Sequence, residues 1–134
     1  MTSSDDIVES LSFFDNWEDR YRYMIDLGKE LPTMPELLRT DDRIVPGCQS
    51  QVWIDYQIEN NKFIFQVDSD ALIVKGLLAI VMAAYNHKTS EEILTFDIEN
   101  YFEQLDLIKH LSPTRGNGLQ AMVEKIKKIA SEEN

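Results

Sequence analysis

The one cysteine of the chain, Cys48, is the residue whose chemistry most needs an explanation. It stands in the stretch "RIVPGCQSQVWI" (43–54), directly after a Pro-Gly pair. The proline fixes one backbone angle and Gly47 permits unusual ones, so the thiol follows a sharp bend. The residues that follow, Gln49 and Ser50, are polar and suit an approachable surface. Two interpretations stay open on this basis: a buried and inert thiol, as is common for free cysteine, or a reactive thiol mounted on a loop.

Other residue types that carry chemistry form no convincing pattern. A zinc or iron site needs three or four soft or nitrogen ligands, and the two histidines, His87 and His110, have no metal-like spacing with each other or with Cys48. The five glycines are scattered, so no Gly-rich phosphate loop is present. Paired carboxylates such as Asp41 and Asp42 indicate solvated surface in a chain this acidic. We therefore expect no metal and no cofactor.

The bulk composition limits the classes of function. With 134 residues, of which 43% are hydrophobic and 28% charged, the chain suits one globular domain spanning 1–134. Its 24 acidic and 13 basic residues give a net charge of -11, which repels phosphate backbones. We expect no nucleic-acid partner, and the charge is compatible with docking onto a basic protein surface.

The distribution of apolar residues predicts a protein that does not enter a membrane. The acidic start, "MTSSDDIVESLSFF", has neither the basic region nor the apolar core of a signal peptide. The most apolar stretch, Ala71 to Tyr85, is shorter than the roughly 20 residues of a membrane span and contains Lys75. A single cysteine fits a reducing compartment, and we expect the cytoplasm.

Periodicity predicts two amphipathic segments that begin the domain and its sheet. A helix is expected from Asn16 until Leu31 and Pro32 end it, followed by a short helix at 35–39. Alternating apolar residues then predict two strands, 52–58 and 62–68, joined by a turn at 59–61 into a hairpin with one apolar face. If the strand phase extends backward, Cys48 lies on the sheltered side of this hairpin.

The second half of the chain is expected to be helical. A buried helix is predicted from Ala71 to about Asn86, capped by Ser69 or Asp70, with short helices near 90–94 and 97–104. Ser112 and the proline after it mark the start of a last helix. Helices, then strands, then helices predict an α+β fold: a small antiparallel sheet, made of the hairpin with room for a third strand, packed against several helices.

Four stretches of the sequence together resemble one known family. They are "YRYMIDLGKELP" (21–32), "VPGCQSQVW" (45–53), "DSDALIVKGLLAIV" (68–81) and "LSPTRGNGL" (111–119). In this order and spacing the chain resembles the SufE family of sulfur acceptors, from about residue 13 to the C-terminus. The resemblance implies a small α+β fold similar to that of the IscU scaffold proteins.

The resemblance also implies a function for the thiol. SufE-like proteins partner a pyridoxal-phosphate (PLP) cysteine desulfurase, accept its persulfide sulfur on a cysteine, and stimulate its turnover. The sulfur then passes to the scaffold for iron–sulfur clusters, the SufBCD complex where one exists. Carried onto this chain, the acceptor is Cys48, and the protein is an accessory carrier without enzymatic activity of its own. One cysteine suffices for this transfer, whereas a cluster scaffold needs several ligands.

Several residues near these motifs keep alternative roles. Arg115 either lies near the thiol and favours its anion or only fixes the start of the last helix. Asp70 either caps the buried helix, which we favour, or contacts the desulfurase. Gln49, Ser50 and Trp53 are candidates for the docking surface or the cysteine pocket, and Trp53 equally suits packing on the other face of the hairpin.

A second class of function is a stand-alone thiol enzyme, such as a cysteine hydrolase or a single-cysteine reductase. Such an enzyme requires a base close to the thiol, and the histidines at 87 and 110 are the candidates. Sulfur gained by Cys48 from cysteine and a desulfurase would favour the carrier. Activity on small substrates without a partner would favour the enzyme.

Overall fold

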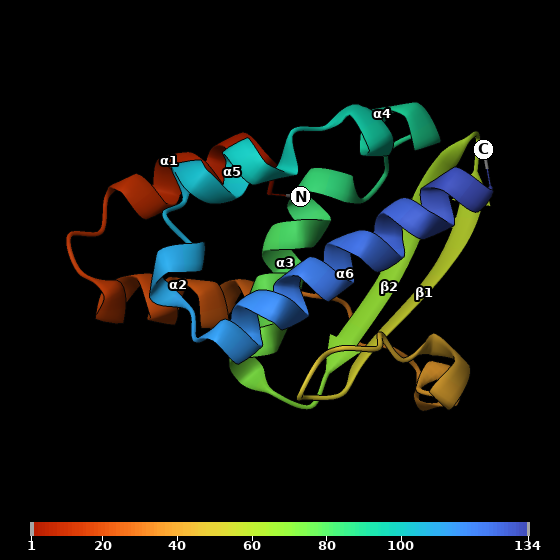
Figure 1. Ribbon diagram of the computed structural model, residues 1–134, viewed down its shortest axis with the longest axis horizontal. Helices are drawn as coiled ribbons and strands as arrows, with labels where there is room; N and C mark the ends of the chain where they lie inside the picture. Colours follow the sequence, from red (N-terminus) through yellow and green to blue (C-terminus); the bar gives the residue numbers. More distant parts are fainter. Residues whose placement is uncertain (1, 134) are drawn as a thin grey trace.

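The computed structural model describes residues 2–133, in which several helices pack against one antiparallel hairpin (Figure 1). The α-helices and strands follow in the order α1 (Ser4–Ser12), α2 (Trp17–Lys29), β1 (Val52–Glu59), β2 (Lys62–Ser69), α3 (Leu72–Tyr85), α4 (Ser90–Thr95), α5 (Ile98–Gln104) and α6 (Pro113–Glu132). Three short 3-10 helices connect them: η1 (Glu36–Leu38), η2 (Asp41–Arg43) and η3 (Ile108–His110). This arrangement confirms the predicted α+β class.

The sheet of the described residues consists of two strands in the predicted antiparallel register. Ile54 pairs with Val67 and Tyr56 with Phe65, which places the alternating apolar residues on one face. The possible third strand is present only as an isolated bridge, in which Ile44 pairs with Trp53 at the outer edge of β1. The 3-10 turn η2 ends directly before this bridge, so the chain has no length of extended backbone with which to continue the pairing.

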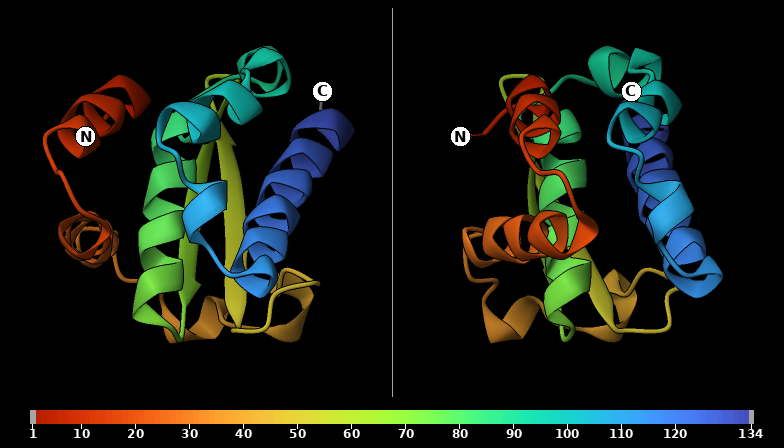
Figure 2. Two further views of the ribbon diagram at one scale, coloured as in Figure 1. Left: turned by 60° about the vertical axis from the view of Figure 1, so that its left-hand side comes forward. Right: turned by 90° about the vertical axis from the view of Figure 1, so that its left-hand side faces the viewer.

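The apolar face of the hairpin is covered by α3 and α6. In Figure 1, α6 runs diagonally in front of α3 and the strands, and in the turned views of Figure 2 it stands to the right of both. The inner face of α6 contributes buried Leu119, Met122 and Ile126 to the core, close to the predicted pattern. The helix begins as predicted, because the Ser112 hydroxyl accepts a hydrogen bond of 3.2 Å from the backbone N–H of Arg115.

The central helix α3 is buried along most of its length because α2 crosses it at very short distance. A Cβ at Gly28 would lie 2.6 Å from the backbone nitrogen of Gly76, and one at Gly76 would lie 2.4 Å from the carbonyl oxygen of Met24. Neither contact leaves room for a side chain. This crossing therefore requires glycine on both helices and fixes the position of α3, whose first turns reach the cysteine loop.

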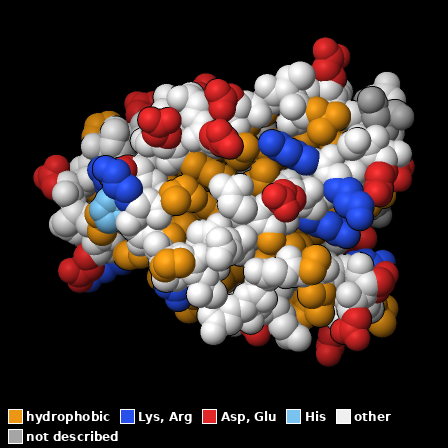
Figure 3. All heavy atoms as spheres, viewed as in Figure 1, with side chains coloured by type: hydrophobic (Ala, Val, Ile, Leu, Met, Phe, Trp, Pro, Cys, Tyr) orange, Lys and Arg blue, Asp and Glu red, His pale blue; other side chains and the backbone are white. Residues whose placement is uncertain are grey.

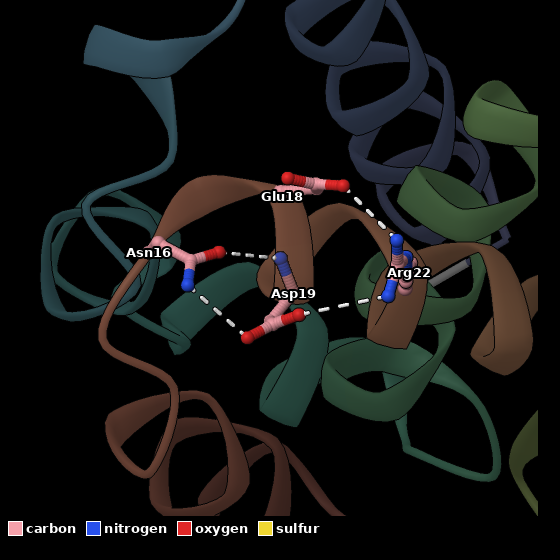
Figure 4. Close-up of polar contacts among 4 residues, drawn as sticks. All are labelled: Asn16, Glu18, Asp19 and Arg22. Atoms are coloured by element: carbon pink, nitrogen blue, oxygen red, sulfur yellow. Dashed lines mark hydrogen bonds and ion pairs between the residues drawn. The ribbon is translucent and has the colours of Figure 1, made fainter.

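The start of α2 shows why the prediction at Asn16 was correct (Figure 4). The Asn16 side chain accepts a hydrogen bond of 2.9 Å from the backbone N–H of Asp19 and so caps the helix. Arg22, one turn later, forms exposed ion pairs with Glu18 and Asp19. The helix before it, α1, was not predicted, although Ser3 and Asp6 form a reciprocal capping box at its start.

The face of the protein shown in Figure 3 carries acidic side chains along much of its outline. Acidic side chains are spread over several edges of the face shown in Figure 3, around hydrophobic side chains near its middle. Within residues 2–133, none of the helices has the length and apolarity that crossing a membrane requires.

Candidate functional site

The loop that carries Cys48 is bent and held close to α6 by a glycine with unusual backbone geometry. Gly47 has a φ of +92°, a conformation that residues with a Cβ rarely adopt. A Cβ at this position would also touch the Cβ of Ala121 at 3.4 Å. The loop then joins β1, where the Val45 N–H donates to the Val52 carbonyl at 2.8 Å. The Pro-Gly bend inferred from the sequence therefore positions the thiol against α6.

The Cys48 side chain is half-buried, with its sulfur directed at the backbone of α6. Its Sγ lies 3.5 Å from the carbonyl oxygen of Gly118, to which the thiol donates a weak hydrogen bond. A Cβ at Gly118 would lie 3.5 Å from this same sulfur, in ordinary van der Waals contact. The missing side chain of Gly118 therefore leaves open space beside the sulfur. The predicted sheltered orientation of Cys48 agrees with this geometry.

The sulfur opens into a cavity of about 280 Å³ formed by three segments distant in sequence. These are the cysteine loop, the first half of α3 and the first turns of α6, which lie side by side in Figures 1 and 2. The lining residues are Cys48, Gln49, Ser50, Val74, Leu77, Ser112, Thr114, Arg115, Gly118 and Met122. The cavity is thus apolar on the side of α3 and polar at its rim.

Burial raises the pKa of the Cys48 thiol above its ordinary value. Desolvation disfavours the thiolate, and no charged group among the described residues offsets it. The thiol is therefore protonated at neutral pH in this conformation, and it needs exposure or a neighbouring base to become a nucleophile.

Three of the predicted site residues meet at the cavity. Gln49, Ser50 and Arg115 all line it, and Gly47 supplies the bend before it. The backbone N–H of Arg115 donates to the Ser112 hydroxyl at the start of α6, as the structural interpretation of this residue expects. Its side chain is exposed and takes no part in that contact.

Asp70 has a different role from the predicted cap. The residue at the cap position of α3 is Ala71, without a side-chain hydrogen bond, so the expectation that Ser69 or Asp70 caps this helix was wrong. The Asp70 carboxylate instead accepts a hydrogen bond of 3.1 Å from the Gln51 N–H, and the Asp70 N–H donates to the Gln51 carbonyl at 3.3 Å. The backbone enters α3 in an extended conformation that directs Asp70 toward the loop. This pair of bonds, which we call the Asp70–Gln51 clasp, ties the end of the cysteine loop to the start of α3.

Trp53 lies outside the cavity, on the other face of the hairpin. It is buried, and the guanidinium of Arg39 lies 5.8 Å from its ring centroid. Arg39 also pairs with the buried carboxylate of Asp68 at 2.5 Å, and Lys75 lies 3.5 Å from the same group. The packing interpretation of Trp53 is therefore the one that agrees with the structure.

Neither histidine is near the thiol. The ring of His110 stacks on Trp17 with centroids 3.9 Å apart, and His87 follows the end of α3, away from the cavity lining. Among the described lining residues there is no histidine and no carboxylate that could serve as a base for Cys48. In residues 2–133 no three side chains of His, Cys, Asp or Glu are grouped to hold a metal ion.

Several cavity residues were not identified from the sequence. Gly118 and Thr114 lie within a predicted family motif but carry no reactive group, and Val74, Leu77 and Met122 read as ordinary core positions. These residues come close to the thiol only through tertiary packing. The contact between Cys48 and Gly118, for example, joins positions that are 70 residues apart in the sequence. The one available signal was the pair of glycines in "RGNGL", which is unusual so early in a long helix.

Comparison with known proteins finds relatives along nearly the whole chain. The family model described as "Fe-S metabolism associated domain", SufE, matches residues 5–130. An uncharacterized SufE-like protein of Rhizobium meliloti is 47% identical over 134 residues, covering 97% of this chain and 96% of the relative. The cysteine desulfuration protein SufE of Wigglesworthia glossinidia brevipalpis is 43% identical over 124 residues, covering 92% of this chain and 86% of the relative.

A solved structure shows the same fold. The solution structure of a hypothetical protein from Thermus thermophilus matches with a TM-score of 0.78 at 16% identity, covering 96% of this chain and 93% of the other. The family model and the close relatives cover nearly the whole sequence, including the cysteine loop and the start of α6. The chain therefore belongs to the SufE family, whose domain is associated with iron–sulfur metabolism.

Proposed function

We propose that this protein accepts persulfide sulfur on Cys48 from a PLP-dependent cysteine desulfurase, stimulates that enzyme, and passes the sulfur on for iron–sulfur cluster assembly. The downstream recipient is a SufBCD-type scaffold, and the transfer takes place in the cytoplasm, where a lone thiol stays reduced. The observation that carries the proposal is the position of the only thiol. It sits on a loop bent at Gly47, facing a cavity open beside Gly118.

The transfer requires no metal, cofactor or second cysteine in this chain. The Cys48 thiolate attacks the outer sulfur of the desulfurase persulfide, forming a new S–S bond at Sγ. The S–S bond within the enzyme persulfide breaks, and its inner sulfur leaves as a thiolate. One proton leaves Cys48 and one proton is taken up by the released enzyme thiol, so there is no net oxidation or reduction.

The sheltered position of the thiol implies that docking changes its surroundings. The pKa of Cys48 is raised by burial, so the resting protein is a poor nucleophile toward other thiols and disulfides. A desulfurase that exposes the loop, or that brings a base to it, removes this block at the moment of transfer. The same shelter then protects the outer sulfur of the Cys48 persulfide during transit.

Arg115 is proposed to favour the anionic persulfide. Its exposed side chain lines the cavity at the rim, where it can reach an added sulfur that extends from Cys48. We expect Arg115→Ala to slow sulfur acceptance several-fold while the melting temperature stays the same, since the helix start uses only the backbone N–H. A variant with wild-type melting temperature and wild-type transfer rate would leave Arg115 with a structural role alone.

The competing function is a stand-alone thiol enzyme. That class needs a base beside the thiol, and the described lining of the Cys48 cavity offers neither a histidine nor a carboxylate. The carrier function agrees better with this lining because the partner can supply the base. Partner-independent turnover of small thioester or disulfide substrates, lost in Cys48→Ser, would reverse this preference.

The test is the output of sulfide by a cognate desulfurase, chosen by pull-down from the candidate desulfurases of the source cell. We expect the wild-type protein to raise sulfide release in the presence of L-cysteine and a reductant. Cys48→Ser and the Cys48-alkylated protein should still bind the desulfurase without raising its output. Unchanged stimulation by either form would refute the proposal.

A further inference from the structure

A second hollow of the protein lies away from Cys48 and is more apolar than the thiol cavity. It has a volume of about 400 Å³ and is formed by α1, the end of α2, β2 and the second half of α3. We call it the α3 groove. Its lining residues are Thr2, Ile7, Leu27, Glu30, Leu31, Pro32, Ile64, Phe65, Gln66, Val67, Ala79, Met82, Ala83, Asn86 and His87. It shares no lining residue with the Cys48 cavity.

The groove follows from how α3 is covered. This helix is apolar on all sides, so every side of it has to be packed against another element. The α2 helix covers it at the Gly28–Gly76 crossing but ends at Lys29, after which the chain turns away at Leu31. Two small residues one turn apart, Ala79 and Ala83, then leave a depression beyond the crossing.

The floor and the rim of the groove differ in chemistry. The floor is buried and apolar, with Leu27, Phe65 and Met82 among its residues. The rim carries the exposed carboxylate of Glu30. An adjoining hollow, which shares Thr2, Leu27 and Glu30 with the groove, is lined also by Asp6, Glu9 and Asp26. Neither lining contains a lysine or an arginine among the described residues.

We propose that the α3 groove is a docking site for a partner segment that places a large apolar side chain on the groove floor and lysine or arginine beside it. The apolar floor supplies the anchor site, and the four carboxylates next to it supply charge complementarity. The net charge of -11 adds to the attraction for a basic segment and repels anionic lipids and nucleic acid.

The position of the groove separates this partner from the sulfur donor. The Cys48 cavity uses Val74 and Leu77 in the first half of α3, whereas the groove uses residues from Ala79 onward. A protein held in the groove therefore leaves Cys48 accessible. The inference does not depend on the role proposed for Cys48, and its test needs no desulfurase.

The test uses a synthetic acetylated and amidated peptide with the sequence Lys-Lys-Leu-Phe-Lys-Lys. Binding is measured by fluorescence anisotropy and by mapping amide chemical shifts in the full chain. We expect shifts at Leu31, Gln66 and Ala83, and loss of binding when the lysines are replaced by glutamate or the Leu-Phe pair by serine. Absence of binding, shifts that map elsewhere, or equal binding of the glutamate peptide would overturn the proposal.

Two matched charge variants distinguish specific binding in the α3 groove from general electrostatic attraction to the protein. Glu30→Lys should weaken peptide binding by up to about fivefold, the upper end of what one exposed charge pair contributes. Glu124→Lys, an equal change of net charge on the exposed side of α6, should leave binding unchanged. Ala83→Arg, which fills the groove with a good helix former, should abolish binding while far-UV circular dichroism stays native. Equal effects of the Glu30 and Glu124 variants, or dimerisation through the groove in light scattering, would refute the partner described here.

Discussion

The properties of Cys48 depend on two glycines that contribute no chemistry of their own. Gly47 allows the bend that brings the loop to α6, and Gly118 leaves the space that the sulfur faces. The resulting thiol is half-buried, burial raises its pKa, and a cavity of about 280 Å³ lies beside it. At the scale of residues, the site therefore consists of the Cys48 thiol and of two glycines, Gly47 and Gly118, whose lack of a side chain allows the bend and the open space.

The reactivity of Cys48 should depend on pH in a way that shows its burial. Because burial raises its pKa, the rate of alkylation by iodoacetamide should reach its midpoint above the value of about 8.5 typical of a free cysteine. The unfolded chain loses this proton first, so the free energy of unfolding should fall as the pH rises from about 8.5 toward the pKa of the folded state. Cys48→Ser should remove this part of the slope. A midpoint at or below 8.5 would contradict the described burial.

Two glycines of α6 provide a matched pair of substitutions. Alanine is the better helix former, so Gly116→Ala and Gly118→Ala should each stabilise the protein by up to about 1 kcal/mol in urea unfolding. A Cβ at position 116 meets nothing within 4 Å, whereas one at position 118 contacts the Cys48 sulfur at 3.5 Å. Only Gly118→Ala should therefore slow alkylation and sulfur acceptance by Cys48. Equal rates in the two variants would show that the space beside Gly118 is not used.

The elements that position the thiol are joined to one another by few but specific contacts. The α2–α3 crossing fixes α3, the Asp70–Gln51 clasp ties the cysteine loop to α3, and the Ser112 cap starts α6 beside the thiol. The loop itself has little regular structure between η2 and β1. The clasp restrains the end of the loop next to β1, in addition to the bond between Val45 and Val52 and the contact of Cys48 with Gly118.

Removing the side-chain bond of the clasp, while its backbone bond stays, should loosen the loop without unfolding the protein. Asp70→Ala should cost about 1 kcal/mol, the value of one hydrogen bond, and should speed alkylation of Cys48 several-fold because the loop opens more often. Asp70→Asn keeps an acceptor oxygen for the Gln51 N–H and should stay close to wild type. Alkylation of the Asp70→Ala variant at the wild-type rate would mean that the loop is held by other contacts.

The elements could be predicted where local signals are strong. The caps at Asn16 and Ser112, and the alternation along the hairpin, located α2, α6 and the strands because these signals act within a few residues. The first helix, α1, was missed because it has only a few apolar residues and its capping box uses aspartate in place of glutamate. The site was predicted only in part, since Gly118 meets the thiol through a contact that no local pattern encodes.

At the scale of the whole molecule, α3 links two separate hollows. Its first half lines the Cys48 cavity, and its second half lines the α3 groove. Acidic side chains are spread along the edges of the face shown in Figure 3, in a chain with a net charge of -11. This arrangement suits a protein that is held by one partner while its thiol meets another.

The central claim is most directly tested by the intact mass of the protein after incubation with L-cysteine and a cognate desulfurase. We predict a gain of one sulfur atom, located on Cys48 by peptide mapping, removed by dithiothreitol and absent in Cys48→Ser. An unchanged mass of wild-type protein under conditions in which the desulfurase turns over, or the same gain in Cys48→Ser, would contradict the account.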